Sequence, residues 1–261
     1  MSENLPLLLT ATINSNVYNN VGNIITDIQL RKEQYYTCLN KYITETDFNP
    51  IIFIENSDYN IDKKLFYDCA KLHSKQIEFI SGSIMKKEII NYGKSFGDAF
   101  LIMEALSKSV LLNNEEFFYK VSGRIFLKNH RAICQTALKQ RNEFIIYDSL
   151  KYCFTNFFKV NKNDYLTYFN KSYTLCNETN QKLIENVFYD IIKTSNITVS
   201  CFKVYPNFDG VMGATGGNYS GKKFERYLRN IAIKLGVFNY KSKWRFIISI
   251  LYKVKTNIIN H

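Results

Sequence analysis

Polar residues stand at or just beyond the ends of four segments that have the composition of β-strands. The segments are LPLLLTATI, PIIFIE, FFYKV and EFIIY. The residues at their ends are Thr10 and Thr12; Glu55, Asn56 and Ser57; Ser122, Gly123 and Arg124; and Asp148 and Ser149. In open α/β sheets, ligands bind in the crevice outside the carboxyl ends of the strands. These four strand ends are therefore candidate binding residues.

The residue types at two of these ends suit a phosphorylated nucleoside. Glu55 accepts hydrogen bonds from a diol, while Asn56 both donates and accepts, and Ser57 adds a hydroxyl. The same three residues also suit an ordinary polar turn closed by side chain–backbone hydrogen bonds. The guanidinium of Arg124 can bind a phosphate through paired hydrogen bonds, although a surface salt bridge is the commoner role of an arginine.

The segment GKSFGDAF, residues 93–100, precedes an amphipathic helical pattern. Gly97 allows close approach of a ligand to the backbone, and Lys94 supplies a positive charge. Asp98 falls in the first helical turn, where a carboxylate also serves as an ordinary cap. The spacing is not that of a P-loop.

A later segment, PNFDGVMGATGGNYSG, concentrates several glycines in residues 206–221. Backbone N–H groups around Gly213, Thr215 and Gly216 can cradle a phosphate, because no bulky side chains stand in the way. The alternative is a plain flexible loop.

The elements that must position these residues alternate along the chain. Strand patterns cover residues 5–13, 50–55, 75–81, 117–123, 143–149, 150–158 and 197–206, and helical patterns cover 26–43, 62–72, 93–109 and 177–195. This alternation predicts an α/β fold with a Rossmann-type, mixed and mostly parallel sheet flanked by helices. We expect one domain over residues 1–221 and a basic helical tail over residues 222–261.

Composition narrows the class of protein. The 261 residues are 46% hydrophobic and carry a formal net charge of +11, which indicates a folded protein attracted to an anionic partner. Nucleic acid, nucleotide phosphates and an acidic membrane surface all fit. The six cysteines show no metal-ligand spacing and are expected to be reduced, and no segment has the length of a signal peptide or membrane span.

The order of these motifs resembles the nucleotide-binding half of a GT-A glycosyltransferase. More narrowly, ITDIQLRKEQY, GKSFGDAFLIMEAL and FFYKVSGRIFLKN are similar to bacterial glycosyltransferases of surface polysaccharides such as capsule, O-antigen or lipopolysaccharide. The resemblance covers about residues 5–220. It implies a GT-A-like fold and transfer of a sugar from a nucleotide-sugar donor, with a UDP-sugar the first choice, to a lipid-linked oligosaccharide acceptor.

The resemblance also implies roles for individual residues. Thr12, Glu55, Asn56 and Ser57 would hold the nucleoside, and Lys94 and Arg124 the phosphates. Gly213, Thr215 and Gly216 would close over the donor, and Thr10, Gly97 and Gly123 are further expected binding residues. An inverting transfer needs a carboxylate to accept the proton of the acceptor hydroxyl, and Asp98, Asp148 and Glu185 are candidates. Arg124 stands where an Asp-x-Asp would hold a divalent metal. This suggests an enzyme that needs no metal or holds it elsewhere.

The tail combines positive charge with an apolar stripe formed by Trp244, Ile247, Ile248, Leu251, Val254 and Ile258. Such a helix can lie in the headgroup layer of an anionic membrane, or it can pack on the core of the domain. The first case predicts a cytoplasmic enzyme bound to the inner face of the cell membrane. Two other functions fit the sequence: a sialyl-type transferase that uses a CMP-sugar, and a basic nucleic-acid-binding protein. Aromatic side chains within strands favour core packing over the stacking of bases, so nucleic acid is not the expected partner.

Overall fold

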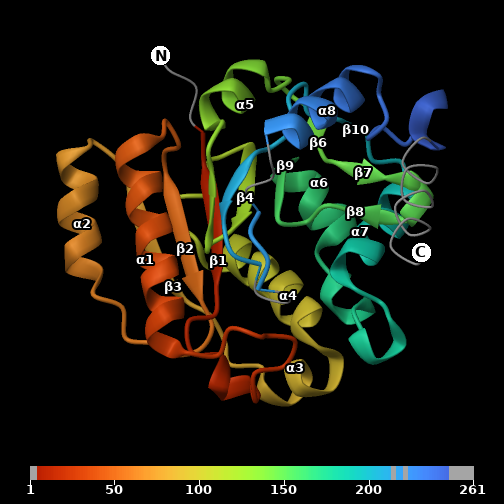
Figure 1. The fold of residues 1–261 in the computed structure, drawn as a ribbon. Coiled ribbons are helices and arrows are strands. Elements are labelled where there is room, and N and C mark those ends of the chain that lie inside the picture. The colour runs from red at the N-terminus through yellow and green to blue at the C-terminus, as the bar shows by residue number, and fades with distance from the viewer. Residues whose placement is uncertain (1–4, 213–215, 220–222, 247–261) are drawn as a thin grey trace.

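The computed structural model describes residues 5–212, 216–219 and 223–246. At its centre is a seven-stranded sheet in the order β10-β6-β9-β4-β1-β2-β3 (Figure 1). The strands are β1 Leu7–Ala11, β2 Ile51–Glu55, β3 Ile77–Ser81, β4 Phe117–Ser122, β6 Asn142–Glu143, β9 Phe157–Asn161 and β10 Val199–Ser200. The first four are parallel, β9 is antiparallel to β4 and β6, and β10 is parallel to β6. The predicted mixed, mostly parallel sheet is confirmed.

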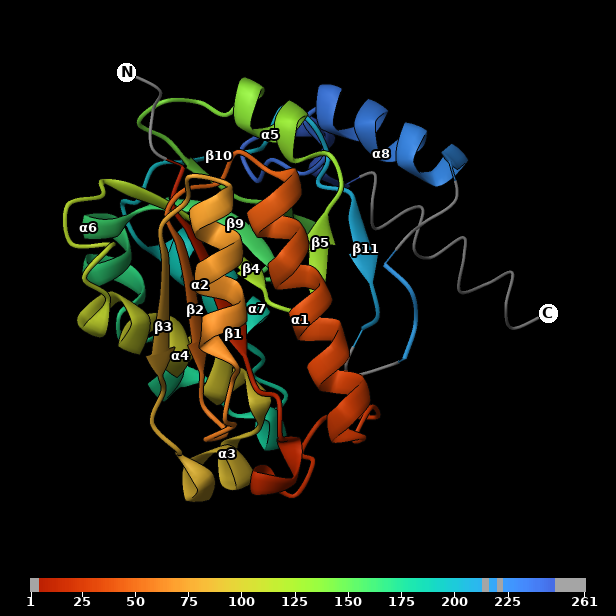
Figure 2. The same cartoon turned by 90° about the vertical axis from the view of Figure 1, so that its left-hand side faces the viewer.

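Helices cover both faces of this sheet, as continuous apolar strands such as LLLTA and IIFIE require. Helices α1 (Ile28–Glu45) and α2 (Lys63–Leu72) cover one face, seen in front of the strands in Figure 2. Helices α4 (Lys94–Lys108) and α7 (Ile184–Thr194) lie against the other face. The predicted flanking helices are therefore present.

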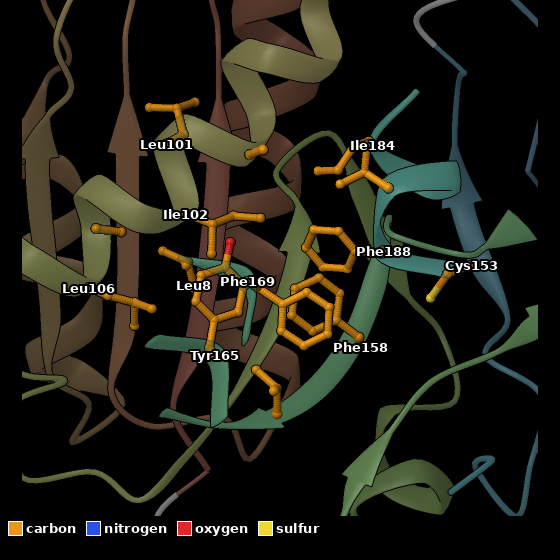
Figure 3. Packing of buried hydrophobic residues seen from close by; sticks show 14 of the residues in the cluster. Leu8, Leu101, Ile102, Leu106, Cys153, Phe158, Tyr165, Phe169, Ile184 and Phe188 are labelled. Carbon is orange, nitrogen blue, oxygen red and sulfur yellow. The ribbon is translucent and has the colours of Figure 1, made fainter. Parts of the chain in front are cut away.

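Alternate residues of each strand enter different cores, because side chains alternate across a sheet. Leu8 and Phe118 join α4 and α7 in one cluster, and Leu7 and Tyr119 join α1 in the other. Figure 3 shows the first cluster, where the rings of Phe169 and Phe188 lie 4.6 Å apart.

Shorter elements complete the described chain. Two small antiparallel pairs join β5 (Ile125–Leu127) to β11 (Phe208–Gly210) and β7 (Ile146–Tyr147) to β8 (Tyr152–Cys153). The other helices are α3 Lys86–Tyr92, α5 His130–Thr136, α6 Lys162–Asp164 and α8 Lys223–Lys234, with a π-helical turn at Tyr165–Phe169. Single 3-10 turns occur at Ser15–Tyr18, Asp148–Leu150, Ser172–Leu175, Glu178–Asn180 and Lys243–Phe246.

Several predicted boundaries were wrong. The helix expected from residue 177 begins at Ile184, because a 3-10 turn ends at Gln181 in the left-handed region with φ 57°. Each of the two strands expected over residues 143–149 and 150–158 is split into two, the first into β6 and β7 and the second into β8 and the start of β9. A turn in which Lys151 has φ 49° separates β7 from β8. The long strand expected over 197–206 pairs only at Val199–Ser200.

The segment beyond residue 222 is joined to the core in part. Ile233 and Phe238 are buried in the α1-side cluster, and the backbone N–H of Ile146 donates to the carbonyl of Phe238 at 3.1 Å. Positions 247–258 of the predicted apolar stripe lie outside the described residues. In the described part of the chain, no helix is both long enough and apolar enough to cross a membrane.

Candidate functional site

A pocket of about 790 Å³ lies at the carboxyl ends of β1 and β4. It brings together ten of the residues predicted from the sequence: Thr10, Thr12, Asn56, Lys94, Gly97, Asp98, Ser122, Gly123, Arg124 and Glu185. Arg31 of α1 lines the pocket as well, so it contains three cationic side chains, those of Arg31, Lys94 and Arg124. It also contains two of the three candidate carboxylates, Asp98 and Glu185.

Asp98 is fixed by a buried lysine that the sequence analysis did not single out. The Nζ of Lys120 lies 2.7 Å from Oδ2 of Asp98 and donates to the carbonyl of Thr155 at 3.1 Å. The hydroxyl of Thr10 donates to Oδ1 of Asp98 at 2.8 Å. The side chain of Lys120 is 0% exposed, and an ammonium in such a place needs a charged partner. Both carboxylate oxygens of Asp98 are thus occupied by contacts with Lys120 and Thr10.

Glu185 lines the same pocket from the first turn of α7. Burial raises the pKa of its carboxyl and outweighs a hydrogen bond from the residue's own backbone N–H, which lowers it. The negative charge of Asp98 raises the pKa further, against smaller opposing effects of Lys120 and of a hydrogen bond with Thr155. The hydroxyl of Tyr152 lies 3.5 Å from its Oε1. A carboxylate whose pKa is moved towards neutrality is well suited to accept a proton.

Arg124 presents a cation that is held in place without being neutralised. One of its terminal nitrogens donates to Oε1 of Gln34 at 3.1 Å, and the guanidinium lies 5.7 Å from the ring centroid of Tyr35. Among the described residues it forms no ion pair with a carboxylate. Lys94 reaches the same pocket, and its Nζ donates to the carbonyl of Gly22 at 3.2 Å.

Arg31 is a second residue that the sequence analysis missed. Its guanidinium is buried and donates to the backbone carbonyls of Thr12, Ile13 and Ile25. Burial lowers its pKa, and the nearby charge of Arg124 lowers it further. A signal was present, since Arg31 stands one helical turn before Tyr35, on the face predicted to be buried. Arg31 holds the chain beyond β1 and adds positive charge to the pocket.

Glu55 and Ser57 do not line the pocket, in contrast to their predicted contact with a nucleoside. The carboxylate of Glu55 accepts from the backbone N–H groups of Ile13 at 2.9 Å, Ser57 at 3.0 Å and Tyr59 at 3.2 Å. The Oγ of Ser57 accepts from the N–H of Asn14 at 2.8 Å. These bonds tie the chain beyond β1 to the turn beyond β2. Asn56 does line the pocket, and its Oδ1 accepts from the hydroxyl of Thr12 at 2.7 Å.

Asp148 also lies away from the pocket. Its Oδ1 accepts from the hydroxyl of Tyr189 at 2.9 Å and from the Nζ of Lys193 at 3.1 Å, so it joins the 3-10 turn beyond β7 to α7. The base role considered for it has no support from this position.

Among the glycines predicted to belong to the site, Gly123 and Gly97 lie where neighbouring elements pack closely, and Gly216 lies in an open loop. A Cβ on Gly123 would lie 2.9 Å from the carbonyl of Thr10, and one on Gly97 would lie 3.0 Å from the side chain of Ile89 on α3. Both positions therefore allow neighbouring elements to approach. Gly216 has φ +69° with open space around it and does not line the pocket. Gly213 and Thr215 lie outside the described residues.

Comparisons with known proteins give remote likenesses of fold. No protein-family model and no curated protein sequence matches the chain. The glycosyltransferase GlyE of Streptococcus pneumoniae TIGR4 is 7% identical, with a TM-score of 0.45 over 76% of this chain. The bifunctional glycosyltransferase WbbM is 10% identical, with a TM-score of 0.47 over 90%. The chain spans 45% of the length of each of these two proteins.

The galactosyltransferase LgtC, whose structure contains donor and acceptor sugar analogues, is 8% identical, with a TM-score of 0.41. That match covers 72% of this chain and 69% of LgtC. All three TM-scores are below 0.5, so the likenesses do not assign a function. In the described residues, no group of three or more His, Cys, Asp or Glu side chains is arranged to hold a metal ion.

Proposed function

We propose that this protein is a glycosyltransferase that moves a sugar from a nucleotide-sugar donor to an oligosaccharide acceptor. The observation that carries the proposal is the joint position of Arg124 and Glu185 in one pocket at the carboxyl ends of the central strands. An inverting sugar transfer uses both charges, a cation for the departing phosphate and a carboxylate for the proton of the attacking hydroxyl.

In the inverting form of the reaction, Glu185 accepts the proton of the acceptor hydroxyl while the oxygen attacks the anomeric carbon. The bond from that carbon to the phosphate oxygen breaks, and the nucleotide leaves with the electron pair. Arg124 and Lys94 lie where they can neutralise the phosphates, and Arg31 strengthens the positive field. Asn56 and Thr12 line the same pocket and would contact the nucleoside. We prefer Glu185 to Asp98 as the base, because Asp98 is paired with Lys120.

The finer parts of the proposal follow the resemblance of the sequence to enzymes of surface-polysaccharide synthesis. The donor would be a UDP-sugar or, as the alternative, a CMP-sugar, and the acceptor a lipid-linked oligosaccharide. The segment 222–261 would hold the enzyme on the anionic inner face of the cell membrane. Its described part agrees with this role, since Phe224, Leu228 and Trp244 are exposed beside lysines and arginines.

A thermal-shift panel of UDP-, GDP-, CMP- and dTDP-sugars, with and without Mn²⁺, tests the proposal. Saturation with the correct donor is expected to raise the melting temperature by about 4 °C or more. Arg124→Gln should remove the shift, while the matched control Lys128→Gln, an exposed cation outside the pocket, should keep it.

The outcomes separate the possible functions. A lack of response to every sugar nucleotide would contradict the proposal. If the chain instead binds single-stranded oligonucleotides with a steep salt dependence, the nucleic-acid alternative is correct. A response to CMP-sugars alone would select the sialyl-type transferase.

A further inference from the structure

A second pocket, of about 620 Å³, lies beside the first and has an aromatic wall. The rings that line it belong to Tyr147, Tyr152, Phe154, Tyr205, Phe208 and Tyr219. Helix α8 closes one side, and α5 contributes Ala132; these helices lie at the same end of the molecule in Figure 2. The hydroxyls of Tyr147 and Tyr205 lie 2.7 Å apart, which fixes two of the rings.

The two pockets share part of their walls. Tyr152, Met212 and Tyr219 line both of them. The hydroxyl of Tyr152 lies 3.5 Å from Oε1 of Glu185, so the shared wall is also the neighbourhood of the proposed base. A molecule in the second pocket can therefore present a hydroxyl to Glu185 past Tyr152.

Two arginines of α8 line the second pocket, one helical turn apart. They are Arg226 and Arg229, and the guanidinium of Arg229 lies 5.1 Å from the ring centroid of Tyr205. Neither forms an ion pair with any residue in the described part of the chain. Glu225 lines the same pocket and can accept hydrogen bonds from hydroxyls. With two arginines and one carboxylate, the α8 side of the second pocket carries a net positive charge.

We infer that the second pocket binds the acceptor and that the acceptor is a glycan with an anionic group, either a carboxylate or a phosphate. The role as acceptor rests on the proposed function. Aromatic faces carry partial negative charge and attract the C–H face of a pyranose ring. A guanidinium binds a carboxylate or phosphate through paired hydrogen bonds, which a neutral sugar cannot provide. The pocket thus selects both for a sugar ring and for its charge.

Saturation-transfer NMR titrations of the full chain, without any nucleotide, test this inference. The probes are glucose against glucuronic acid, and N-acetylglucosamine against N-acetylglucosamine 1-phosphate. The first pair tests a carboxylate on the glycan, and the second a phosphate such as that of a lipid carrier. In at least one pair the anionic sugar is expected to bind about tenfold more tightly than the neutral one.

The variants locate the effect. Arg226→Gln should remove the preference for the anionic sugar, and Arg229→Gln should reduce it. Lys234→Gln, which removes an exposed charge from the same helix outside both pockets, should leave it unchanged. The inference is overturned if neither pair shows a preference, if the preference persists in Arg226→Gln, or if Lys234→Gln loses it equally.

The two proposals fail separately. If nucleotide sugars give no thermal shift but Arg226 still controls binding of an anionic sugar, the glycan site stands and the transferase proposal falls. If a nucleotide sugar stabilises the chain and no anionic sugar is preferred, the second pocket is not the site inferred here and the donor site stands.

Discussion

At the scale of single residues, Glu185 is half-buried and has a raised pKa. Because of this raised pKa, a rise in pH should increase activity and decrease stability. As a base it must be deprotonated, so kcat/KM should rise as the pH rises through its pKa, which lies above the usual 4.5. The same raised pKa means that its stabilising contribution to folding is lost as the pH rises through that value. The deprotonated form of Glu185 is therefore the active one, and the protonated form is the one that favours the folded state.

Replacing Glu185 by Gln should separate these effects. We expect sugar transfer to fall by about 10²-fold or more, because the proton acceptor is lost. The melting temperature at pH 8 should be equal to or above that of the wild type, because no buried charge remains. Steady-state kinetics and thermal unfolding across pH 5–9 measure both; retained transfer with an unchanged pH profile would rule out Glu185 as the base.

The pair of Asp98 and Lys120 is a second residue-scale feature with a measurable consequence. Lys120→Met removes the partner of a carboxylate that is 28% exposed, so we expect a loss of about 2–3 kcal/mol in the free energy of unfolding. Asp98→Asn should cost at least as much, because it leaves the ammonium of Lys120 buried without its partner.

A double-mutant cycle by urea unfolding tests this coupling. The combined loss in the double variant should be smaller than the sum of the single losses by about 1 kcal/mol or more. Additive losses would mean that the 2.7 Å contact contributes nothing as a pair.

At the scale of elements, the start of α4 depends on a residue far away in the chain. Glu178 accepts from the backbone N–H of Ser95 at 2.9 Å and from its hydroxyl at 2.6 Å, so it acts as a cap supplied from outside the helix. Because Gly97 and Asp98 follow directly, this contact also fixes one wall of the pocket.

Glu178→Ala should lower the free energy of unfolding by about 1–2 kcal/mol and weaken donor binding. The matched control is Glu33→Ala on the exposed surface of α1, which is expected to change stability by less than about 0.5 kcal/mol. Equal effects in urea titrations of the two variants would refute the capping role.

The central elements could be predicted from the sequence because each is marked locally. Strands β1 and β2 are mostly apolar runs, β4 is an apolar run interrupted by Lys120, and Asp27 and Asp62 begin α1 and α2 as side-chain caps. The broken strands after residue 142 have no such marks, since short pairings such as Val199–Ser200 depend on partners elsewhere in the chain.

The site was predictable to a similar extent. Thr10, Asn56, Asp98 and Arg124, which line the candidate pocket, could be proposed because polar residues near strand ends and helix starts are visible in the sequence. Glu185 was proposed as an acidic residue within a predicted helix, and it also lines the pocket. Glu55 was assigned to the ligand although its carboxylate binds backbone N–H groups, and the direction of a side chain within a turn cannot be deduced from residue type. Lys120 carried a usable signal, because a lysine between apolar strand residues must be buried with a partner.

At the scale of the whole molecule, the net charge of +11 and the exposed apolar residues of α8 predict binding to anionic vesicles. In sedimentation with vesicles of 30% phosphatidylglycerol, binding should weaken by about tenfold between 0.05 and 0.5 M salt, because the attraction is screened. Phe224→Ser with Leu228→Ser should weaken binding further without a change of charge.

The control for this prediction is Leu72→Ser at the far end of α2, where an 84% exposed leucine is available. Equal binding to neutral vesicles, or an equal effect of Leu72→Ser, would contradict membrane association through the segment that begins at residue 222.

The order of the strands affects when the pocket can form during synthesis on the ribosome. Strand β1 lies between β2 and β4, and the charged residues of the pocket come from positions 31, 94, 98, 124, 178 and 185. In a nascent chain, β1, β2 and β3 can therefore form early, but the pocket is not complete until α7 has emerged from the ribosome. Competence to bind a donor is then one of the last properties acquired during folding. A bound donor therefore stabilises only a chain in which all of these segments have already come together.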